Sequence, residues 1–383
     1  MESTFYRDTW VEINLDHIKD NVSAVKGYLA KGVQICAVVK ANAYGHGDIE
    51  VAKAAIEAGA TCLATAFLDE AIALRKKGII VPILVLGAIR AADVPIAAAY
   101  EISATVYNNE WLQEAAGNLA AEKPLRVHIK CDTGMGRLGY KHMEDIKAAE
   151  KMIMSSDCFE LEGIYTHFAT ADELDLTYYH KQLGTFKEMV SILETKPPIV
   201  HCSNSAASLR FEEAWYNAIR LGISMYGLSP SPAIKELLPV PLKEAFSLHS
   251  RIVHVKKIKP GESVGYGATY TAAEEEWIAT IPIGYADGWL RKLQGQEVLV
   301  DGQKMPIVGR ICMDQCMIRL PRHYPEGTKV TLIGENNGSF ISVDEIAAKL
   351  STINYEVVCM INQRVPRVYV ENEKISSIRN PLI

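Results

Sequence analysis

The sequence contains no run of about 18 uninterrupted apolar residues, the length that a membrane-spanning helix requires. Its first ten residues are polar and charged, and they lack the apolar core of a signal peptide. There is no long run of lysine and arginine, and the formal net charge is -6, so no basic footprint for nucleic acid is present. These absences predict a cytoplasmic protein that binds neither membranes nor nucleic acid.

The sequence also lacks paired cysteines. It has eight cysteines, but none forms a Cys-x-x-Cys motif, and several lie inside apolar runs typical of strands. They are therefore interpreted as small buried hydrophobic residues. The nearest pair, Cys312 and Cys316, has no cluster of histidine or cysteine at zinc spacing around it. No metal site is predicted.

What is present is a regular alternation of strand-like and helix-like segments. The chain has 383 residues, of which 49% are apolar, enough for one large core or two. Eight strands that alternate with helices favour a TIM-type (β/α)8 barrel over an open doubly wound sheet. The expected strands cover 35–39, 62–66, 82–86, 102–106, 125–130, 161–166, 199–202 and 218–221.

The alternation stops near residue 228, and short strands punctuated by Gly and Pro follow Pro239-Val240-Pro241. This change predicts a domain boundary at residue 240, with a mostly antiparallel β domain over 241–383. We expect 13–240 to form the barrel and 1–12 to be a strand associated with the C-terminal domain. The expected strands of that domain cover 250–256, 277–282, 297–300, 305–311, 315–320 and 329–334, with one helix at 343–350.

The segment 35–47 places an isolated lysine at the end of a buried strand. An apolar run leads to Lys40, and small residues with Gly45 and Gly47 follow, which supply backbone freedom to end the strand. A partly desolvated lysine has a lowered pKa and an amine available for Schiff-base chemistry. The alternative is that Lys40 only caps the strand and reaches to water.

Other expected strands also end in polar side chains. These are Lys130, His167, Asn204 and Arg220. Because catalytic groups of TIM barrels gather at the C-terminal ends of the strands, we expect these side chains to share one face. Asn204 and Ser205 after the seventh strand, with Gly222 and Ile223 after the eighth, occupy the corner where such barrels commonly bind phosphate. The alternative for Asn204-Ser205 is an ordinary helix cap.

Four motifs carry a resemblance to a known family. The string Ala37-Val38-Val39-Lys40-Ala41-Asn42-Ala43-Tyr44-Gly45-His46-Gly47 resembles the cofactor-lysine motif of the alanine racemases, and the segments 218–223, 264–267 and 310–315 resemble other motifs of that family. The resemblance implies pyridoxal 5'-phosphate (PLP) as cofactor. It implies interconversion of L-alanine and D-alanine by two bases, Lys40 and Tyr266, and a supply of D-alanine for peptidoglycan.

The resemblance also implies roles around the cofactor. Tyr44 and Tyr355 match the phosphate-contacting tyrosines, and Arg220 matches the arginine that faces the pyridine nitrogen. Arg220 would keep that nitrogen unprotonated, which favours racemisation over transamination. The alternative is a buried arginine paired to a carboxylate.

Further barrel residues are expected to support this arrangement. His167 is expected to pack near the cofactor ring, to orient Arg220 and, with it, to lower the pKa of Tyr266. Arg137 would bind the substrate carboxylate and the cofactor's phenolic oxygen. Lys130 matches a lysine that is often carbamylated in this family to hold that arginine.

The β domain would complete the site of a second subunit. In the resembled family the tyrosine matched by Tyr266 reaches the partner's lysine, so we expect a homodimer with shared active sites. The signature that contains Cys312, Met313 and Asp314 would present the backbone of Met313 to the substrate carboxylate, and Tyr285 would line the entrance.

Several alternatives remain open. Gly134-Met135-Gly136-Arg137-Leu138-Gly139 matches a dinucleotide-binding pattern, but it follows the fifth strand with no tight turn. A non-catalytic PLP carrier would have no use for Tyr266, and a PLP decarboxylase would be poorly served by Arg220. A racemase for serine or for several amino acids differs less from the alanine racemase interpretation than these two do, although the ring of Tyr355 argues for a small substrate side chain.

Overall fold

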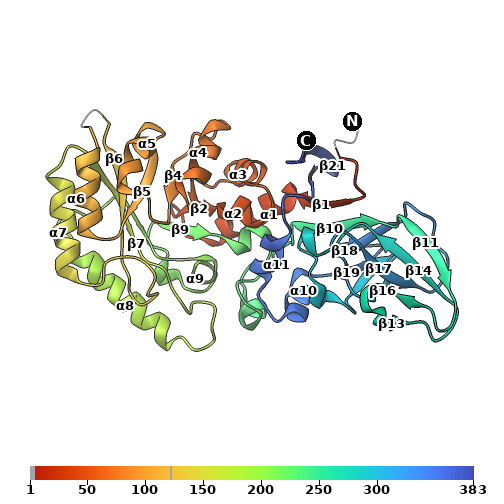
Figure 1. Cartoon of the computed structure of the whole chain (residues 1–383). Coiled ribbons are helices and arrows are strands. Elements are labelled where there is room, and N and C mark those ends of the chain that lie inside the picture. Colours follow the sequence, from red (N-terminus) through yellow and green to blue (C-terminus); the bar gives the residue numbers. More distant parts are fainter. Residues whose placement is uncertain (1–4, 121–122) are drawn as a thin grey trace. The chain divides into compact units, whose positions relative to one another are not determined.

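The computed structural model describes residues 5–120 and 123–383, so the first four residues of the expected N-terminal segment 1–12 lie outside the described residues (Figure 1). Its internal contacts divide the chain into two compact units. The barrel unit comprises Ile18–Ala43 and Asp48–Lys243. The sheet unit comprises the described residues up to His17, together with Tyr44–Gly47 and Glu244–Ile383.

The barrel unit contains eight parallel strands in its described residues, which confirms the predicted fold class. They are β2 (Gln34–Val38), β3 (Cys62–Thr65), β4 (Ile83–Val85), β5 (Ile102–Val106), β6 (Leu125–Lys130), β7 (Phe159–Tyr165), β8 (Ile199–His201) and β9 (Ala218–Leu221). The spatial order is β8-β7-β6-β5-β4-β3-β2-β9, so β9 returns to pair with β2 and the barrel is nearly closed. Because the strands are parallel, the residues that follow each of them gather at one face.

Helices connect these strands, and Figure 1 shows α6, α7 and α8 outside the barrel strands. The helices are α1 (Leu15–Tyr28), α2 (Lys40–Tyr44), α3 (Asp48–Glu57), α4 (Leu68–Lys76), α5 (Val94–Ala99), α6 (Asn109–Asn118), α7 (Met143–Met154), α8 (Thr177–Ser191) and α9 (Ser205–Arg210). Short 3₁₀ turns are η1 (Ala91–Asp93), η2 (Glu212–Ala214), η3 (Ile223–Tyr226) and η4 (Pro232–Leu237). Each amphipathic helix buries its apolar side; in α8 this side includes Tyr179, Leu183 and Phe186.

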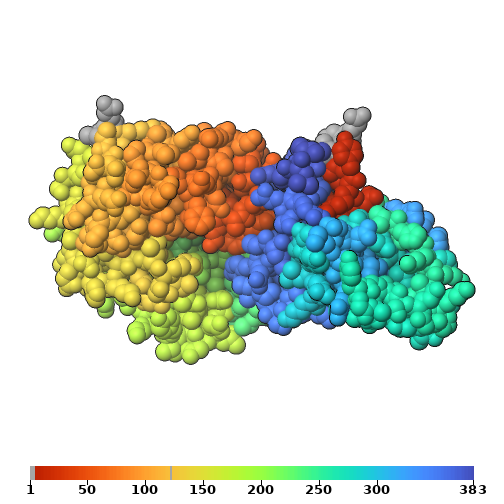
Figure 2. All heavy atoms as spheres, in the orientation of Figure 1, coloured from red at the N-terminus to blue at the C-terminus, as the bar shows by residue number. Residues whose placement is uncertain are grey.

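The sheet unit is a mostly antiparallel sheet, also as predicted. Its strands are β1 (Thr9–Asn14), β10 (Phe246–Arg251), β11 (His254–Ile258), β14 (Glu276–Ile281), β15 (Glu297–Val300), β16 (Gln303–Val308), β17 (Cys316–Leu320), β18 (Lys329–Asn336), β19 (Ser339–Ile341), β20 (Arg367–Glu371) and β21 (Lys374–Arg379). A separate hairpin joins β12 (Ser263–Val264) to β13 (Tyr270–Thr271). β11 is an edge strand, since among the described strands it pairs with β14 alone. Figure 2 shows the surface of this sheet in green to blue colours.

Several details of this unit differ from the prediction. The strands β12, β13, β19, β20 and β21 were not expected. The strand expected over 250–256 is two strands, because the chain changes neighbours: Ile252 N–H donates to Thr328 O, whereas Val253 N–H donates to Thr280 O. The helix expected at 343–350 is α10 (Val343–Leu350), capped by Ser342 Oγ, but a second helix, α11 (Asn354–Met360), follows it. The remaining 3₁₀ turns are η5 (Tyr266–Ala268), η6 (Tyr285–Asp287) and η7 (Arg291–Leu293).

Neither membrane-crossing helices nor metal-binding clusters occur in the described ranges. Their helices are too short or too polar to cross a bilayer. No group of three or more His, Cys, Asp or Glu side chains gathers in these ranges to hold a metal ion.

Candidate functional site

Lys40 follows β2 and begins a turn of unusual backbone conformation. Ala41, Asn42, Ala43 and Tyr44 have φ values of 53°, 54°, 51° and 53°, the left-handed region. Left-handed geometry costs about 1–2 kcal/mol per non-glycine residue, so this turn needs external support. Gly45 and Gly47 also have positive φ, 83° and 105°, so the left-handed region extends over four non-glycine residues as well as the two glycines.

The turn is held by side chains on both sides of it. Glu70, in the first turn of α4, accepts a hydrogen bond from Ala41 N–H at 2.6 Å with one carboxylate oxygen. Its other oxygen accepts from Ala66 N–H at 2.8 Å. Asn42 Oδ1 accepts from Asp48 N–H at 3.2 Å. The half-buried Lys40 thus extends from a strained but anchored backbone.

The two glycines are needed for space. A Cβ on Gly45 would lie 2.2 Å from Val358 O, and one on Gly47 would lie 1.7 Å from Tyr369 Oη. All four residues belong to the sheet unit. Both glycines also have positive φ, so no other residue type fits these positions without displacement.

Arg220 lies in β9 and is only 3% exposed. Its Nη1 donates to His201 Nδ1 at 2.9 Å. Its Nη2 donates to Thr166 O at 2.7 Å and Cys202 O at 3.0 Å, and lies 3.2 Å from His167 Nδ1. No carboxylate of the described residues pairs with it, so the alternative of an arginine–carboxylate pair is wrong.

His167 brings most of the predicted barrel residues into one place. Burial lowers its pKa well below the usual value, and four nearby cations add to the shift: Arg220, Lys130, Arg137 and Lys40. His167 is therefore neutral near pH 7. The expectation that it contributes positive charge is wrong, and the positive charge of this face comes from the surrounding cations.

Lys130, at the end of β6, is 4% exposed. Burial, followed by the charge of Arg220, lowers its pKa to about 7. Its Nζ donates to Cys131 O at 2.9 Å and lies 5.1 Å from the centre of the Tyr165 ring. Close to neutral pH a large share of this amine is therefore uncharged and nucleophilic. Arg137 is exposed in the loop that follows.

The loop after β6 also settles the glycine pattern at 134–139. Residues 131–142 form no helix, and α7 begins only at Met143. Asp132 Oδ1 accepts from the N–H groups of Gly134 and Gly136 at 3.2 and 2.9 Å. The backbone donors that a pyrophosphate would need are thus bonded to Asp132, and no helix N-terminus follows directly.

The corner after β8 and β9 gathers hydroxyl and amide groups. Asn204 caps α9, since its Oδ1 accepts from Ala207 N–H at 3.0 Å. Ser205 Oγ accepts from Gly222 N–H at 2.9 Å and from Ser224 N–H at 3.4 Å. The hydroxyl of Ser224 is buried and lacks a hydrogen-bond partner. This orphaned group was missed from the sequence; it lies two residues beyond Gly222, beside the predicted Ile223.

Two observations indicate that the barrel unit fits pyridoxal phosphate. The buried Ser224 hydroxyl beside Ser205 requires a polar partner. Arg220 presents a guanidinium that no carboxylate neutralises, which suits a neutral pyridine nitrogen as acceptor.

The sheet unit holds Tyr44 and Tyr355, whose ring centres lie 6.1 Å apart. Burial, with a smaller contribution from Cys359, raises the pKa of Tyr44, so its hydroxyl stays protonated as a donor. Tyr355, on α11, is half-buried. The structure thus brings together the two tyrosines that the sequence assigned to phosphate.

Three further predicted residues of the sheet unit have exposed side chains. Tyr266 is 71% exposed, Met313 52% and Tyr285 39%. Tyr266 lies between Gly265 (φ 76°) and Gly267 (φ 74°), and a Cβ on Gly267 would meet Arg310 Nη1 at 2.9 Å. The glycines thus let the turn pack on Arg310 while Tyr266 extends outward.

Backbone hydrogen bonds join the Tyr285 and Met313 loops. Tyr285 N–H donates to Cys312 O, and Ala286 N–H donates to Met313 O, both at 3.0 Å. Gly284 permits this contact, because a Cβ there would lie 2.3 Å from Cys312 O. The two exposed side chains therefore belong to one rigid segment.

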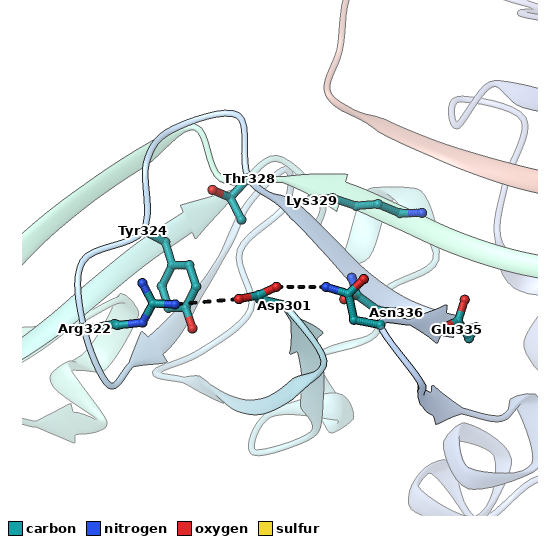
Figure 3. A pocket seen from close by; sticks show the side chains of 8 residues that line it. Asp301, Arg322, Tyr324, Thr328, Lys329, Glu335 and Asn336 are labelled. Carbon is teal, nitrogen blue, oxygen red and sulfur yellow. Dashed lines mark hydrogen bonds and ion pairs between the residues drawn. The ribbon is translucent and has the colours of Figure 1, made fainter.

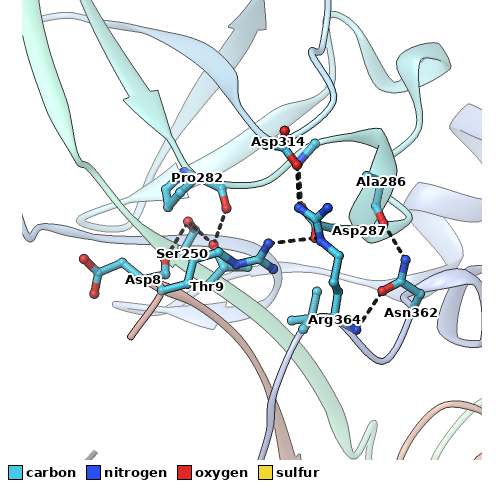
Figure 4. Close-up of polar contacts among 12 residues, drawn as sticks. Asp8, Thr9, Ser250, Pro282, Ala286, Asp287, Asp314, Asn362 and Arg364 are labelled. Atoms are coloured by element: carbon cyan, nitrogen blue, oxygen red, sulfur yellow. Dashed lines mark hydrogen bonds and ion pairs between the residues drawn. The ribbon is translucent and has the colours of Figure 1, made fainter. Parts of the chain in front are cut away.

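An ion-pair network centred on Asp287 stabilises the joined Tyr285 and Met313 loops (Figure 4). Asp287 is fully buried, and its Oδ1 accepts from Arg7 Nη1 at 2.8 Å and Arg364 Nε at 2.9 Å. Its Oδ2 accepts from Gly284 N–H at 3.0 Å. Arg364 also pairs with Asp314 at 2.5 Å. Asp287 and Arg364 were missed from the sequence, because isolated charged residues give no signal of pairing across about 80 residues.

One surface cavity of about 490 Å³ lies in the sheet unit, lined by Asp301, Arg322, Tyr324, Thr328, Lys329, Glu335, Asn336 and Asn337 (Figure 3). Asp301 pairs with Arg322 at 3.6 Å and accepts from Asn337 Nδ2 at 2.8 Å. None of the predicted site residues lines this cavity. Since the predicted residues lie elsewhere, this cavity is not the candidate site.

Comparisons with known proteins match both units. The family model described as "Alanine racemase, N-terminal domain" matches residues 13–230, and that described as "Alanine racemase, C-terminal domain" matches 245–369. The chain is 60% identical over 376 residues to the alanine racemase of Geobacillus kaustophilus, covering 98% of each chain.

Solved structures give the same result. The structure of alanine racemase from Bacillus anthracis with bound L-Ala-P aligns with a TM-score of 0.96 and 50% identity, over 99% of each chain. A histidine racemase from Leuconostoc mesenteroides aligns with a TM-score of 0.91 and 32% identity, over 97% of this chain and 100% of that one. By sequence and by structure along nearly its whole length, the chain belongs to the alanine racemase family.

Proposed function

We propose that this chain is a PLP-dependent alanine racemase, which interconverts L-alanine and D-alanine and supplies D-alanine for peptidoglycan synthesis. The observation that carries the proposal is the buried Arg220, which lies among cations at the C-terminal ends of the barrel strands and pairs with no carboxylate of residues 5–120 and 123–383. It occurs in a chain 60% identical to an alanine racemase.

The cofactor is held by groups from several elements. Bound PLP withdraws electrons from the substrate Cα and so makes its proton acidic. Lys40 would hold the cofactor aldehyde through its amine, and Arg220 would face the pyridine nitrogen. The phosphate would be bound by Tyr44, Tyr355, Asn204, Ser205, Gly222 and Ile223, to which the structure adds the orphaned hydroxyl of Ser224.

Arg220 directs the reaction toward racemisation. Its guanidinium only donates hydrogen bonds and stays charged, so it leaves the pyridine nitrogen without a proton. An unprotonated ring withdraws electrons less strongly, which disfavours transamination. His167, neutral and 3.2 Å from Arg220 Nη2, helps to orient the guanidinium.

Lys40 and Tyr266 act as the two bases on opposite faces of the substrate. One removes the Cα proton, and the other returns a proton from the other side, so each serves one direction of the reaction. Tyr266 is 71% exposed in the single chain, which supports its insertion into a partner subunit's site. We therefore propose a head-to-tail homodimer with shared active sites.

The substrate carboxylate would be bound by Arg137 and by the partner's loop. A carboxylate needs donors, so the N–H of Met313 is the backbone group that meets it. The neighbouring Cys312 and Asp314 hold this loop, and Tyr285 lines the entrance. Lys130 would help to hold Arg137; its amine, with a pKa lowered to about 7, would react with CO₂ and lose a proton if it is carbamylated as in the resembled family.

Cytoplasmic location and an amino-acid substrate complete the proposal. The net charge of -6 and the lack of basic runs support the absence of a nucleic-acid partner. Preference for alanine is supported by the Tyr44–Tyr355 pair, whose rings would restrict the space beside the substrate side chain. A serine or broad-specificity racemase is the second candidate, since the fold also occurs in a protein described as a histidine racemase.

The test is chiral analysis of products after separate incubations with L-alanine and L-serine in the presence of PLP. We expect rapid D-alanine formation that is lost in Lys40→Ala, and much slower D-serine formation. Equal rates with both substrates would favour the broad-specificity enzyme. PLP bound through Lys40 with both substrates unchanged would favour a non-catalytic PLP-binding protein.

A further inference from the structure

Three buried side chains and the partly buried Glu162 of the barrel unit form a continuous hydrogen-bonded line that ends on Arg220. Arg220 Nη1 lies 2.9 Å from His201 Nδ1, and His201 Nε2 lies 3.0 Å from His128 Nδ1. His128 Nε2 lies 3.0 Å from Glu162 Oε2. We call Arg220, His201, His128 and Glu162 the relay. It joins residues of β9, β8, β6 and β7.

The chemistry of its ends fixes the direction of the relay. A guanidinium only donates, so His201 Nδ1 must accept and the proton of its neutral ring is on Nε2. That proton is donated to His128 Nδ1, so His128 also carries its proton on Nε2 and donates it to Glu162. Burial, followed by the charge of Arg220, lowers the pKa of His201 well below its usual value, in agreement with a neutral ring.

Glu162 is the anionic end of the line. Burial alone would raise its pKa, but hydrogen bonds from His128 and Ser103 and the charge of Arg126 overcome this effect and lower it to about 2. Ser103 Oγ donates to it at 2.5 Å, and Arg126 Nη1 lies 3.6 Å away. The carboxylate that Arg220 lacks as a direct neighbour is therefore present two imidazole rings away.

The backbone is shaped to place His128 in this line. The pairing of β6 with β7 shifts register between Val127 and His128, a bulge that redirects the side chain. A Cβ on Gly163 of β7 would lie 2.3 Å from His128 Nδ1. Gly163 does not have positive φ, so its lack of a side chain provides room for the ring rather than a turn.

Tyr165 holds the other end of the relay. Its ring stacks on His201 with centres 4.7 Å apart and planes 14° apart. Arg220 Cζ lies 5.2 Å from the centre of the same ring. The Tyr165 hydroxyl is 2.8 Å from Thr105 Oγ1, so the ring is fixed at its far end as well.

We propose that Glu162, acting through His128 and His201, is a positioning residue that fixes the orientation of Arg220 and balances its buried charge. Aligned hydrogen bonds polarise one another, so an anion at one end strengthens the bond that the cation makes at the other. The inference rests on the proposed function, in which Arg220 keeps the pyridine nitrogen unprotonated. Loss of the anion frees the guanidinium to turn and weakens that control.

The consequence is a larger share of transamination. In that side reaction alanine is oxidised to pyruvate, its amino group moves to the cofactor, and the cofactor is reduced to pyridoxamine phosphate. Glu162→Gln keeps the size and an acceptor oxygen but removes the charge. We expect the ratio of D-alanine to pyruvate formed by the PLP-loaded enzyme to fall by about tenfold, at the lower end of effects from outer partners of a reactive centre.

Glu150→Gln is the matched control. Glu150 is 5% exposed, and its carboxylate accepts from Glu194 N–H at 3.1 Å and Thr195 N–H at 2.7 Å, outside the relay. This variant also replaces a hydrogen-bonded carboxylate of the barrel unit, but we expect its product ratio to match the unaltered enzyme. An unchanged ratio in Glu162→Gln, or an equal fall in both variants, would overturn the inference.

Nitrogen-15 NMR of histidine-labelled protein tests the direction of the relay without any variant or turnover. We expect His128 and His201 both to carry their proton on Nε2 at pH 7 to 8, with and without PLP. A proton on Nδ1 of either ring would reverse or break the line and overturn the inference, even if Glu162→Gln fails to fold. Absence of D-alanine formation by the unaltered chain would contradict the proposed function instead, while the NMR result still decides the relay.

Discussion

The barrel unit buries two charged side chains of its candidate site, Arg220 and Lys130, whereas the sheet unit exposes Tyr266. Arg220 and Lys130 are 3% and 4% exposed, but Tyr266 is 71% exposed. The barrel groups are held by side-chain hydrogen bonds and mutual charge effects, while the Tyr266 and Met313 segments are held through their backbones. Side chains left outward on a fixed backbone are suited to another surface, which is why the proposed active site needs a second subunit.

The largest expected effect is on catalysis, and it should distinguish the proposed base Tyr266 from Tyr6, an exposed tyrosine with no assigned role. Tyr266→Phe should lower kcat with L-alanine by about 10³-fold, within the range for loss of a general acid or base. Cofactor absorbance should stay unchanged, since the barrel residues that hold PLP are intact. Tyr6→Phe, at a position 92% exposed in the same unit, should keep full activity. Full activity in Tyr266→Phe would remove its assigned role.

The second test removes the ion pairs of Asp287, which stabilise the Tyr285 and Met313 loops of the sheet unit. Asp287→Ala removes a buried carboxylate that accepts from Arg7, Arg364 and Gly284 N–H, and should lower the free energy of unfolding by about 3 kcal/mol. Asp301→Ala is the control, because its 3.6 Å pair with Arg322 is exposed and should contribute less than about 1 kcal/mol. Urea unfolding measures both. Equal losses would show that Asp287 is no more than a surface charge.

The third test compares how acid changes the stability of the sheet unit and of the barrel unit. Burial, with the charge of Lys329, lowers the pKa of His249 in the sheet unit to about 3. The unfolded chain protonates this ring below about pH 6.5, so the unfolded state binds more protons and stability falls as pH decreases from 6.5 toward 3.

At pH 5 this histidine should cost the sheet unit about 2 kcal/mol relative to pH 7 and above. His249→Gln should remove that loss from the sheet unit and leave the acid response of the barrel unit unchanged. Hydrogen exchange, followed separately on peptides of each unit, provides the measurement. An equal acid response with and without His249 would contradict the assigned cause.

The smallest expected effect concerns the turn that carries Lys40. Glu70→Gln replaces one of two acceptor oxygens and leaves either Ala41 N–H or Ala66 N–H without its partner. We expect a loss of about 1 kcal/mol in stability and a lowered kcat. Asp69→Asn, in the same first turn of α4, is the control. Identical kinetics in the two variants would show that the left-handed turn does not depend on Glu70.

Much of the fold could be predicted because its signal is local. Buried parallel strands are continuous apolar runs, and the ranges 102–106, 125–130 and 218–221 agree with the observed strands. The last strand, β21, was missed because it is largely exposed and reads as polar. The left-handed turn at Ala41–Tyr44 was missed because only its contacts, not its residue types, demand it.

The residues of the candidate site also fall into those that could be predicted from the sequence and those that could not. Polar residues at strand ends could be recognised singly, and His167 proved to lie near Lys40, Lys130, Arg137 and Arg220. His201, His128 and Glu162 could not be recognised, because each is an isolated polar residue within a strand. The relay exists only after the four strands β6, β7, β8 and β9 are aligned. The assignments of Lys40 and Tyr266 as bases stay predictions.

Mixing two inactive variants tests the central claim, that barrel and sheet residues form one active site across a dimer. Lys40→Ala and Tyr266→Phe each damage both sites of their own dimers. When the two are unfolded, mixed in equal amounts and refolded, half of the dimers should be hybrids with one intact site, and racemase activity should recover to about a quarter of normal. Recovery to that level would establish shared sites. No recovery, with hybrids demonstrated by mass spectrometry of tagged subunits, would show that Lys40 and Tyr266 act within one chain.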